Sequence, residues 1–440
     1  MKMDPRKRDA GGDMQAGRGG LSIWKKPATR DTEVVVIGSG AFGSSTAYHL
    51  AALGHKGVAL VDAHEIASQT SPRAAGLTKQ VRSHPDMSRL AMLSVQKILR
   101  FTEELGEPLT YVQSGSVNIA RGDDDEAVIR GEITAGKALG LETYEISFDE
   151  MSLLAPLIRP AGIRIIAYTP SDLYLEEPGQ LPLGYARAAQ KQGVSLLLNT
   201  RVTGIRVQDG RVAAVATDKG EIHARIVVDA AGAWARLVAE QVRLRVPILP
   251  VRHQLYITDP IPGIEPDHAI CRIYDAGVYM RPHQGGLLLG GYERDPQFHD
   301  MHKFPPGFEI RDLPLDLSVL QRLTQSVRAQ VLLDDQLPVR EHRGGLPTMT
   351  ADGLPIIGPV PAIEGLFVAS GCCVGGLSIS PAVGQMLAEV VHTGKPSPAL
   401  EAFSLTRFGR EYEADAALHE ACARQYTGWY SSLPQMPGRG

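Results

Sequence analysis

The stretch over residues 33–62, EVVVIGSGAFGSSTAYHLAALGHKGVALVD, constrains the fold of this chain more than any other. It begins with a short apolar run that predicts a buried parallel strand, continues with three glycines at GxGxxG spacing, and then predicts a helix and a second strand. In such a unit Gly38 permits the tight turn, Gly40 lets a pyrophosphate approach the backbone, and Gly43 allows helix and sheet to pack closely. Asp62 lies 19 residues after Gly43, where a carboxylate that binds ribose hydroxyls belongs. The stretch therefore predicts a dinucleotide site, with a glycine turn in an ordinary strand–helix–strand unit as the alternative.

Two further segments place small residues directly after a predicted buried strand. Residues 226–229 lead into Ala-Ala-Gly-Ala-Trp, and a strand predicted over 366–369 leads into a glycine turn and a helix over 380–391. Such residues indicate that a ligand approaches the backbone closely, and a helix N-terminus directs N–H donors towards an anion. The polar loop after Asp62 can wrap around a long cofactor, although it is also typical of a plain surface loop. Residues 246–292 predict strands of a separate antiparallel sheet.

These segments predict an α/β fold class. We expect a Rossmann-like dinucleotide-binding domain that is interleaved with a mainly antiparallel β-sheet substrate domain of the α+β type. The length of 440 residues fits two interleaved domains or about three consecutive ones. The expected division is 31–115, 175–240 and 340–395 for the dinucleotide domain, 116–174 and 241–339 for the substrate domain, 396–440 for a C-terminal helix and tail, and 1–30 for a disordered extension.

Composition narrows the classes of partner. The net charge of −4 gives no electrostatic reason to expect nucleic acid or an anionic membrane, and no run approaches the ~20 apolar residues of a membrane span. The four cysteines (Cys271, Cys372, Cys373 and Cys422) show no metal-ligand spacing, so we expect no metal site. They suit a reducing compartment, and the charged, glycine-rich start lacks the apolar segment of a signal peptide, so we expect a cytoplasmic protein. We interpret Cys372 and Cys373 as small apolar residues, with a redox pair as the alternative.

Taken together, three separated motifs resemble a known family. GxGxxG, VVDAAGAWA and DGLPIIG…GLFVASG are similar to those of the flavin-dependent amine oxidoreductases, which include D-amino-acid oxidase, glycine oxidase, sarcosine oxidase and dimethylglycine dehydrogenase. The resemblance covers about residues 32–408. It is strongest towards sarcosine and dimethylglycine dehydrogenases and the sarcosine oxidase β subunit, through RAAGLTKQVRSHPD, YVQSGSVNIA and LLLGGYE. It implies a glutathione-reductase-like FAD domain and the oxidation of a secondary or N-methylated amino acid, in which flavin N5 takes a hydride and the resulting imine hydrolyses.

The resemblance also implies which residues contact FAD. It assigns the pyrophosphate to the glycine turn and Gly232, the ribose to Asp62, the adenine end to Val202 and the flavin to the loop after Asp62. The N–H groups at the start of the last helix would stabilise negative charge at the N1–C2=O edge of the reduced flavin, as the helix dipole also predicts. The expected cofactor-binding residues are Gly38, Gly40, Ala41, Phe42, Gly43, Asp62, Thr70, Ser71, Ala75, Gly76, Leu77, Val202, Gly232, Gly376, Leu377 and Ser378.

Three positions depart from the patterns of particular relatives. Arg73 stands where some dehydrogenases carry the histidine that attaches the flavin, and Gly345 stands where monomeric sarcosine oxidase carries the attaching cysteine. The sequence therefore predicts non-covalent FAD. Leu288 stands at about the place of the lysine that activates oxygen in monomeric sarcosine oxidase, which favours a dehydrogenase over an oxidase.

An amino-acid substrate requires a cation for its carboxylate, best a bidentate arginine. The position that carries this arginine in glycine oxidase is Pro347, so we expect Arg82 to bind the carboxylate, with Lys79 near the flavin. Arg82 as a surface or phosphate-side cation is the alternative. Tyr279 and Tyr292 lie on a predicted hairpin that would roof the substrate side of the flavin, and a ring packed in the core is the alternative for Tyr279.

Several functional alternatives stay open from the sequence. His253 and His342 lie near the predicted site, although a lone histidine is more often structural. Besides an amine dehydrogenase, the chain fits an oxidase of the glycine or D-amino-acid type that produces hydrogen peroxide. It also fits the flavin subunit of a heteromeric complex with partner subunits, or nucleotide binding without chemistry. The electron acceptor would be oxygen, a quinone or an electron-transfer protein.

Overall fold

The computed structural model describes residues 30–332, 338–395 and 397–436. The extension expected over residues 1–30 therefore lies outside the described residues, apart from Arg30, which begins the first strand. Within these ranges no helix has both the length and the apolar character needed to cross a membrane. The same residues contain no group of three or more His, Cys, Asp or Glu side chains that could hold a metal ion.

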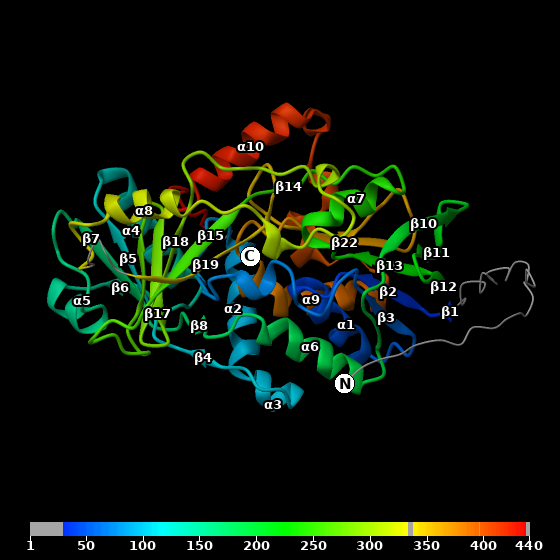
Figure 1. The fold of residues 1–440 in the computed structure, drawn as a ribbon, viewed down its shortest axis with the longest axis horizontal. Coiled ribbons are helices and arrows are strands. Elements are labelled where there is room, and N and C mark those ends of the chain that lie inside the picture. The colour runs from blue at the N-terminus through cyan, green and yellow to red at the C-terminus, as the bar shows by residue number, and fades with distance from the viewer. Residues whose placement is uncertain (1–29, 333–337, 396, 437–440) are drawn as a thin grey trace, which may run out of the picture.

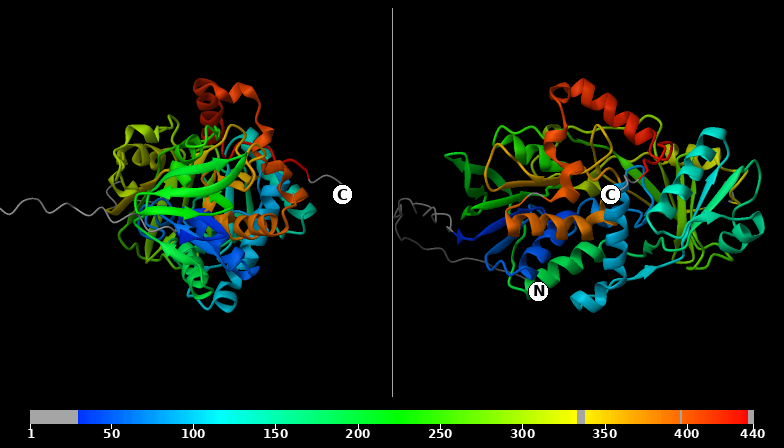
Figure 2. Two further views of the ribbon diagram at one scale, coloured as in Figure 1. Left: turned by 90° about the vertical axis from the view of Figure 1, so that its right-hand side faces the viewer. Right: turned by 180° about the vertical axis from the view of Figure 1, so that it is seen from behind.

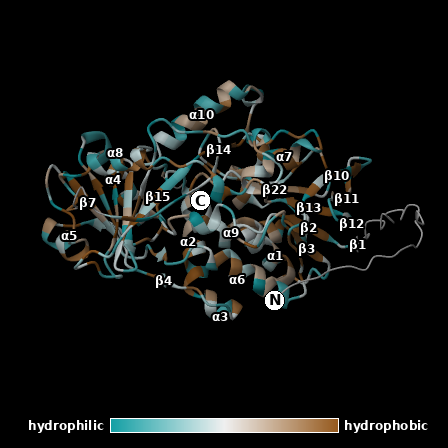
Figure 3. Cartoon of the chain, viewed as in Figure 1, coloured by the Kyte–Doolittle hydropathy of each residue, from teal (hydrophilic) through white to brown (hydrophobic). Residues whose placement is uncertain are grey.

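A six-stranded sheet forms one half of the molecule, at the right of Figure 1. Five strands are parallel and the edge strand β21 is antiparallel. Helices cover one face and a four-stranded sheet covers the other, which explains why β2 and β3 are apolar along their whole length. Figure 3 shows this concentration of apolar residues in the central strands. In spatial order the strands are β21 (Ile356–Pro359), β22 (Leu366–Ser370), β13 (Ile226–Asp229), β2 (Val34–Ile37), β3 (Val58–Val61) and β9 (Ser195–Leu197).

The helices that cover one face of the six-stranded sheet pack on one another around α1. Helix α1 contacts α9 and α6, and α9 also contacts α2, an arrangement seen from behind in Figure 2. Their bounds are α1 (Ala41–Ala52), α2 (Pro85–Leu99), α6 (Gln180–Lys191) and α9 (Gly376–Thr393), with the short α3 (Phe101–Leu105) after α2. The opposite face carries α7 (Ala235–Glu240) and the sheet β1 (Arg30–Asp31), β12 (Gly220–His223), β11 (Arg211–Thr217) and β10 (Val202–Gln208).

An eight-stranded sheet forms the other half, at the left of Figure 1. All of its neighbouring strands are antiparallel except β16 and β5, which are parallel. Its spatial order is β19 (Val339–Gly345), β15 (His253–Thr258), β18 (Gly286–Gly291), β17 (Val278–His283), β16 (Ile270–Ile273), β5 (Ser116–Ala120), β7 (Ile165–Thr169) and β6 (Tyr144–Glu145). The helices α4 (Asp123–Ala138), α5 (Phe148–Leu154) and α8 (Leu317–Ser326) belong to this half.

The predicted pairing of a parallel α/β unit with a mainly antiparallel sheet is confirmed. The domain limits stay a prediction. The range 340–395, which was assigned to the dinucleotide domain, contains all of β19 except its first residue. However, β19 pairs with β15 of the eight-stranded sheet. Two small sheets complete the described structure: β4 (Tyr111–Val112) with β8 (Tyr174–Leu175), and β14 (Leu249–Pro250) with β20 (Thr348–Met349). Helix α10 (Asp415–Thr427) packs on β14 and β20, and therefore lies over the junction of the two halves.

Candidate active site

The larger of two adjoining cavities has a volume of about 710 Å³, within the range of about 300–1,000 Å³ typical of ligand pockets. It lies at the carboxyl ends of β2, β3 and β13, where open parallel sheets bind their ligands. Many residues of the predicted cofactor site line it. These are Gly38, Gly40, Ala41, Phe42, Asp62, Thr70, Ser71, Val202, Gly232, Gly376 and Leu377.

The glycine turn has the close packing that its spacing predicts. Gly38 has φ of +100°, and a Cβ built on it would lie 2.5 Å from the carbonyl oxygen of Ala230. A Cβ on Gly43 would lie 1.8 Å from the carbonyl oxygen of Gly38, so Gly43 packs against the turn and does not line the cavity. Gly40 faces open space, since the nearest atom to its built Cβ is Oγ of Ser71 at 3.4 Å.

Asp62 is held at the end of β3 by three donors. Its Oδ2 accepts from the N–H and the hydroxyl of Ser39 at 2.6 and 2.7 Å, and its Oδ1 accepts from the N–H of His64 at 2.8 Å. A carboxylate with two oxygens offers about four acceptor positions, so one remains for a ligand hydroxyl. This orientation fits the predicted contact with a ribose.

The larger cavity also receives the N-termini of two helices. Gly40 caps α1 and Gly375 caps α9, and neither cap residue has a side chain to bond the first N–H groups, although the N–H of Ala41 donates to Oγ of Ser71 at 3.1 Å. Uncapped N–H groups and the positive end of the helix dipole favour a negatively charged ligand. With the room at Gly40 and the fixed Asp62 carboxylate, the described residues fit a dinucleotide such as FAD.

A smaller cavity of about 100 Å³ adjoins the larger one. Thr70, Ala74, Pro347, Val374 and Leu377 line both cavities, and Ala75, Gly76, Leu77 and Ser378 of the predicted flavin side line the smaller one. Its lining contains four cationic side chains and, among the described residues, no acidic one. The cations are Arg73, Lys79, Arg82 and Arg272. This second space therefore suits a small anionic group.

Arg82 forms no ion pair with an acidic side chain among the described residues, whereas Lys79 pairs with Glu132 and Nη1 of Arg272 lies 3.7 Å from Oδ2 of Asp172. Its side chain is buried at 9% exposure, its Nη2 donates to Oγ of Ser378 at 2.8 Å, and its Nε has no hydrogen-bond partner among the described residues. Burial lowers the pKa of the guanidinium from its ordinary value. A buried guanidinium with a free donor requires an anion, and a carboxylate has the matching two-oxygen geometry.

Lys79 lines the same cavity, but its charge is neutralised by the protein. Its Nζ forms an ion pair with Oε1 of Glu132 at 2.5 Å, and the hydroxyl of Tyr274 donates to the other oxygen of Glu132 at 2.6 Å. Burial lowers the pKa of the ammonium, and the Glu132 carboxylate opposes this effect. Of the two predicted cations, only Arg82 is therefore available to a ligand.

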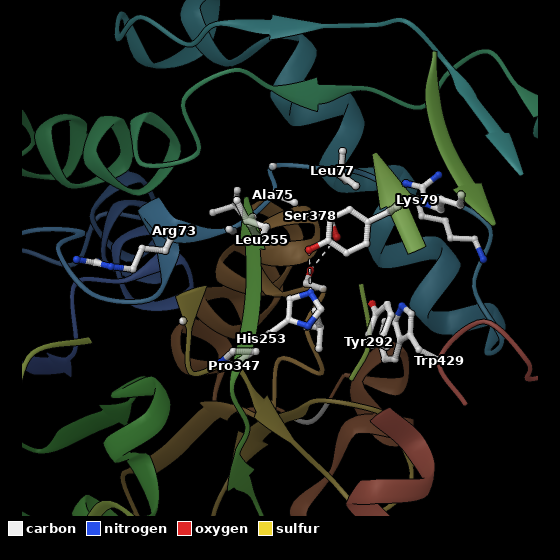
Figure 4. Close-up of a pocket in the computed structure, with 18 of the residues that line it drawn as sticks. Arg73, Ala75, Leu77, Lys79, His253, Leu255, Tyr292, Pro347, Ser378 and Trp429 are labelled. Carbon is white, nitrogen blue, oxygen red and sulfur yellow. Dashed lines mark hydrogen bonds between the residues drawn. The ribbon is translucent and has the colours of Figure 1, made fainter. Parts of the chain in front are cut away.

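Tyr279 forms a hydrogen-bonded pair with His253 at the wall of the smaller cavity, and Figure 4 labels His253 there. Nε2 of His253 lies 2.9 Å from the hydroxyl of Tyr279, and Nδ1 lies 2.8 Å from the hydroxyl of Tyr426, which itself donates to the carbonyl of Arg252. Burial lowers the pKa of His253 to about 4, so the imidazole is neutral. A neutral imidazole carries one N–H, so His253 donates to one of these two hydroxyls and accepts from the other.

Tyr292 lies in a group of aromatic side chains that sequence reasoning missed in part. Its ring stacks on Trp429 with centroids 5.9 Å apart and meets Tyr430 edge-on at 5.3 Å. Trp429 and Tyr430 line the smaller cavity and follow α10, in the range for which the sequence predicted only a helix and tail. The available signal was the run YTGWY, three aromatic residues in five within a chain that is 6% aromatic.

The remaining predicted positions are placed as follows. Pro347 lines both cavities, so its position supplies no cation there. Leu288 pairs with Arg281 across the β17–β18 hairpin and packs in the core rather than lining either cavity. His342 bonds Gln254 at 3.1 Å and is likewise not among the lining residues. All four cysteines are free, and Cys372 lines the larger cavity.

Residues 33–390 match the family described as "FAD dependent oxidoreductase", so the chain belongs to this family and its cofactor is FAD. Among curated relatives, mitochondrial sarcosine dehydrogenase of Mus musculus is 30% identical over 94% of this chain and 46% of its own length. Sarcosine oxidase subunit beta of Rhodobacter capsulatus is 27% identical over 88% of this chain and 91% of its own length. The solved L-proline dehydrogenase from P. horikoshii superimposes with a TM-score of 0.77 at 25% identity, covering 87% of this chain and 99% of that one. The resemblance expected from the motifs is thus confirmed, and the chain spans a little under half the length of the sarcosine dehydrogenase.

We expect the flavin to be bound without a covalent bond. Gly345 offers no side chain, and Nη1 of Arg73 donates to the backbone carbonyls of Ser68 and Gln69, so Arg73 points away from His253 and the cavity centre (Figure 4). Acid precipitation of the purified protein should therefore release all yellow colour into the supernatant. Arg73→His is the matched variant, since imidazole can attack the flavin methyl group where guanidinium cannot. A yellow pellet from the unmodified protein would contradict the prediction.

Proposed function

We propose that this protein oxidises the C–N bond of a small secondary or N-methylated amino acid of the sarcosine type. The observation that carries the proposal is the position of Arg82, a buried guanidinium without an acidic partner, in a small cavity that shares a wall with the FAD cavity. The family and the printed names of its relatives, sarcosine dehydrogenase and sarcosine oxidase subunit beta, support the same substrate class.

The residues of the smaller cavity would bind and orient the substrate. Arg82 binds the carboxylate and Ser378 holds the guanidinium in place, since its hydroxyl accepts from Nη2. Tyr279, whose hydroxyl is hydrogen-bonded to His253 at the wall of the same cavity, offers an oxygen lone pair to the amine N–H. FAD, held by the residues of the larger cavity, would supply the oxidation as a hydride acceptor, and the imine product would hydrolyse in water.

A specific observation favours a second candidate, the flavin subunit of a heteromeric amine dehydrogenase. The chain covers 91% of the length of a relative whose name describes it as a subunit. In that case electrons leave through a partner protein, and the purified chain reduces its flavin without turning over.

We also infer a cytoplasmic location, which the four free cysteines support, although the sarcosine dehydrogenase relative is mitochondrial by name.

Anaerobic bleaching of the flavin tests the proposal. The purified yellow protein is mixed without oxygen with sarcosine, dimethylglycine, glycine, proline, D-alanine and larger N-methyl amines, and the oxidised flavin band is followed before and after air is admitted. We expect bleaching by an N-methyl or secondary amino acid and slow recovery in air. Fast recovery with hydrogen peroxide would make the protein an oxidase. Bleaching without turnover on artificial acceptors supports the subunit, and no bleaching by any amine refutes the substrate class.

A further inference from the structure

We propose that Trp429 and Tyr430 form an aromatic wall that limits the substrate to amino acids without a side chain on the carbon beside the carboxylate. The inference rests on the proposed function and names the substrate class within it, the N-methylated glycines. Both residues line the smaller cavity, and both lie outside the range 33–390 that the family match covers. The wall therefore lies in the C-terminal segment, beyond the residues that the family match covers.

Trp429 lies beside the group that would bind the carboxylate. Its ring is 5.9 Å from Cζ of Arg82, and it stacks on the ring of Tyr292 with an interplanar angle of 21°. A substrate whose carboxylate contacts Arg82 therefore has an indole ring beside the neighbouring carbon. The contact with the guanidinium also stabilises Arg82, since cations are attracted to the face of an indole.

Tyr430 closes the same side and is fixed in place. Its ring stacks on Tyr274 with centroids 4.8 Å apart and an interplanar angle of 12°, and it meets Tyr292 edge-on. It is buried, and Nζ of Lys79 lies 5.7 Å from its ring. The contacts with Tyr274, Tyr292 and Lys79 thus hold the Tyr430 ring in place.

The backbone of the segment is tied down on both sides of the wall. Gly428 N–H donates to the carbonyl of Arg424 at 3.0 Å at the end of α10, and Gln435 N–H donates to the carbonyl of Ser83 at 2.7 Å. Ser83 is the neighbour of Arg82 in sequence. Trp429 and Tyr430 are therefore held between two anchors, one of which adjoins the proposed carboxylate-binding residue.

The volume behind the wall is small. The volume of about 100 Å³ is well below the range of about 300–1,000 Å³ typical of ligand pockets, so the cavity suits a small amino acid. A branched substituent at the carbon beside the carboxylate would meet the rings of the wall, and rigid aromatic packing does not yield without cost.

Binding of unreactive carboxylates tests the wall without requiring turnover. Acetate, propionate, 2-methylpropionate and phenylacetate are titrated into the FAD-loaded protein, and the perturbation of the flavin spectrum gives each Kd. We expect the unmodified protein to bind propionate in preference to 2-methylpropionate, which has one more methyl group on the carbon beside the carboxylate. In Trp429→Ala the ratio of the two Kd values should shift by about tenfold or more towards the branched acid, as one methylene in a fitted pocket is worth about 10–200-fold. Trp429→Phe should retain most of the original ratio.

Two further variants complete the test. Leu433→Ala, on the same segment but 63% exposed, is the matched control and should leave the ratio unchanged. Tyr430→Leu tests the wall independently should Trp429→Ala lose its FAD. An unchanged ratio in both wall variants, with FAD bound, overturns the inference. If the carboxylates discriminate as expected while no amine bleaches the flavin, the proposed reaction fails and the wall stands.

Discussion

Replacing Arg82 with methionine is expected to remove the affinity for carboxylate-bearing amines while FAD stays bound. Arg82 lines only the smaller cavity, and its free donor has no substitute among the described residues. Loss of one partner of a buried, hydrogen-bonded charge pair costs about 2–5 kcal/mol, which corresponds to roughly a 30-fold or larger rise in the apparent Kd. Anaerobic titration of flavin bleaching measures this change, and the visible spectrum measures the FAD content.

Two further variants test whether the loss of affinity depends on the two-point contact of the Arg82 guanidinium with the carboxylate. Arg82→Lys keeps the charge but loses the two-point contact. Its affinity for the carboxylate-bearing amine should therefore lie between that of the unmodified protein and that of Arg82→Met. Arg89→Met removes an exposed arginine from α2 and should change nothing. An unaltered affinity in Arg82→Met would remove Arg82 from the substrate site and favour the phosphate-side or surface alternative.

Replacing Gly43 with alanine is expected to yield protein that has lost much of its FAD. The added methyl group would lie 1.8 Å from the backbone oxygen of Gly38, and a backbone atom cannot rotate away as a side chain can. The turn and the start of α1 must shift apart, which displaces the N–H groups that face the cavity. Overpacking of this kind costs about 1–3 kcal/mol, so we expect FAD affinity to fall by roughly 10- to 100-fold. Flavin fluorescence during titration of the cofactor-free protein gives the Kd.

Gly204→Ala is the matched control for Gly43→Ala. Gly204 lies in β10, has no positive φ, and its built Cβ would make an ordinary contact of 3.6 Å with Ala216. It should bind FAD as the unmodified protein does. Circular dichroism separates a local effect at the turn from general unfolding, and full FAD content in a folded Gly43→Ala protein would contradict the close-packing argument.

The larger cavity could be predicted from sequence because its parts are local. A strand, a glycine turn and a helix N-terminus are adjacent in the chain, so the roles expected of Gly38 and Gly43 follow from a short window. Arg82 was expected from the family resemblance, and it lines the smaller cavity, while its role as the carboxylate-binding residue stays a prediction. By contrast, the pairing of Lys79 with Glu132 joins two elements far apart in sequence, and no local pattern reports it.

The aromatic wall could not be predicted from the sequence for the same reason, because it joins distant parts of the chain. Trp429 meets Tyr292 and Arg82, each of which comes from a distant part of the chain, and the contact depends on the path of the chain after α10. The direction of the Leu288 side chain is another feature that the sequence could not predict. Leu288 lies opposite Arg281 in the hairpin, and the long side chain of Arg281, which donates to the carbonyl of Ala75, takes the space nearest the flavin loop.

The hydrogen bond from Gln435 N–H to the carbonyl of Ser83 affects the order in which the two cavities form during synthesis. Every strand of the two large sheets, and both helix N-termini that face the FAD cavity, leave the ribosome before α10 and the residues that follow it. Domains generally begin to fold from the N-terminal side during synthesis. The cofactor cavity is therefore complete while the substrate cavity is still open to water on one side. Enclosure of the substrate cavity, which Trp429 and Tyr430 bring about, therefore follows the formation of the cofactor cavity.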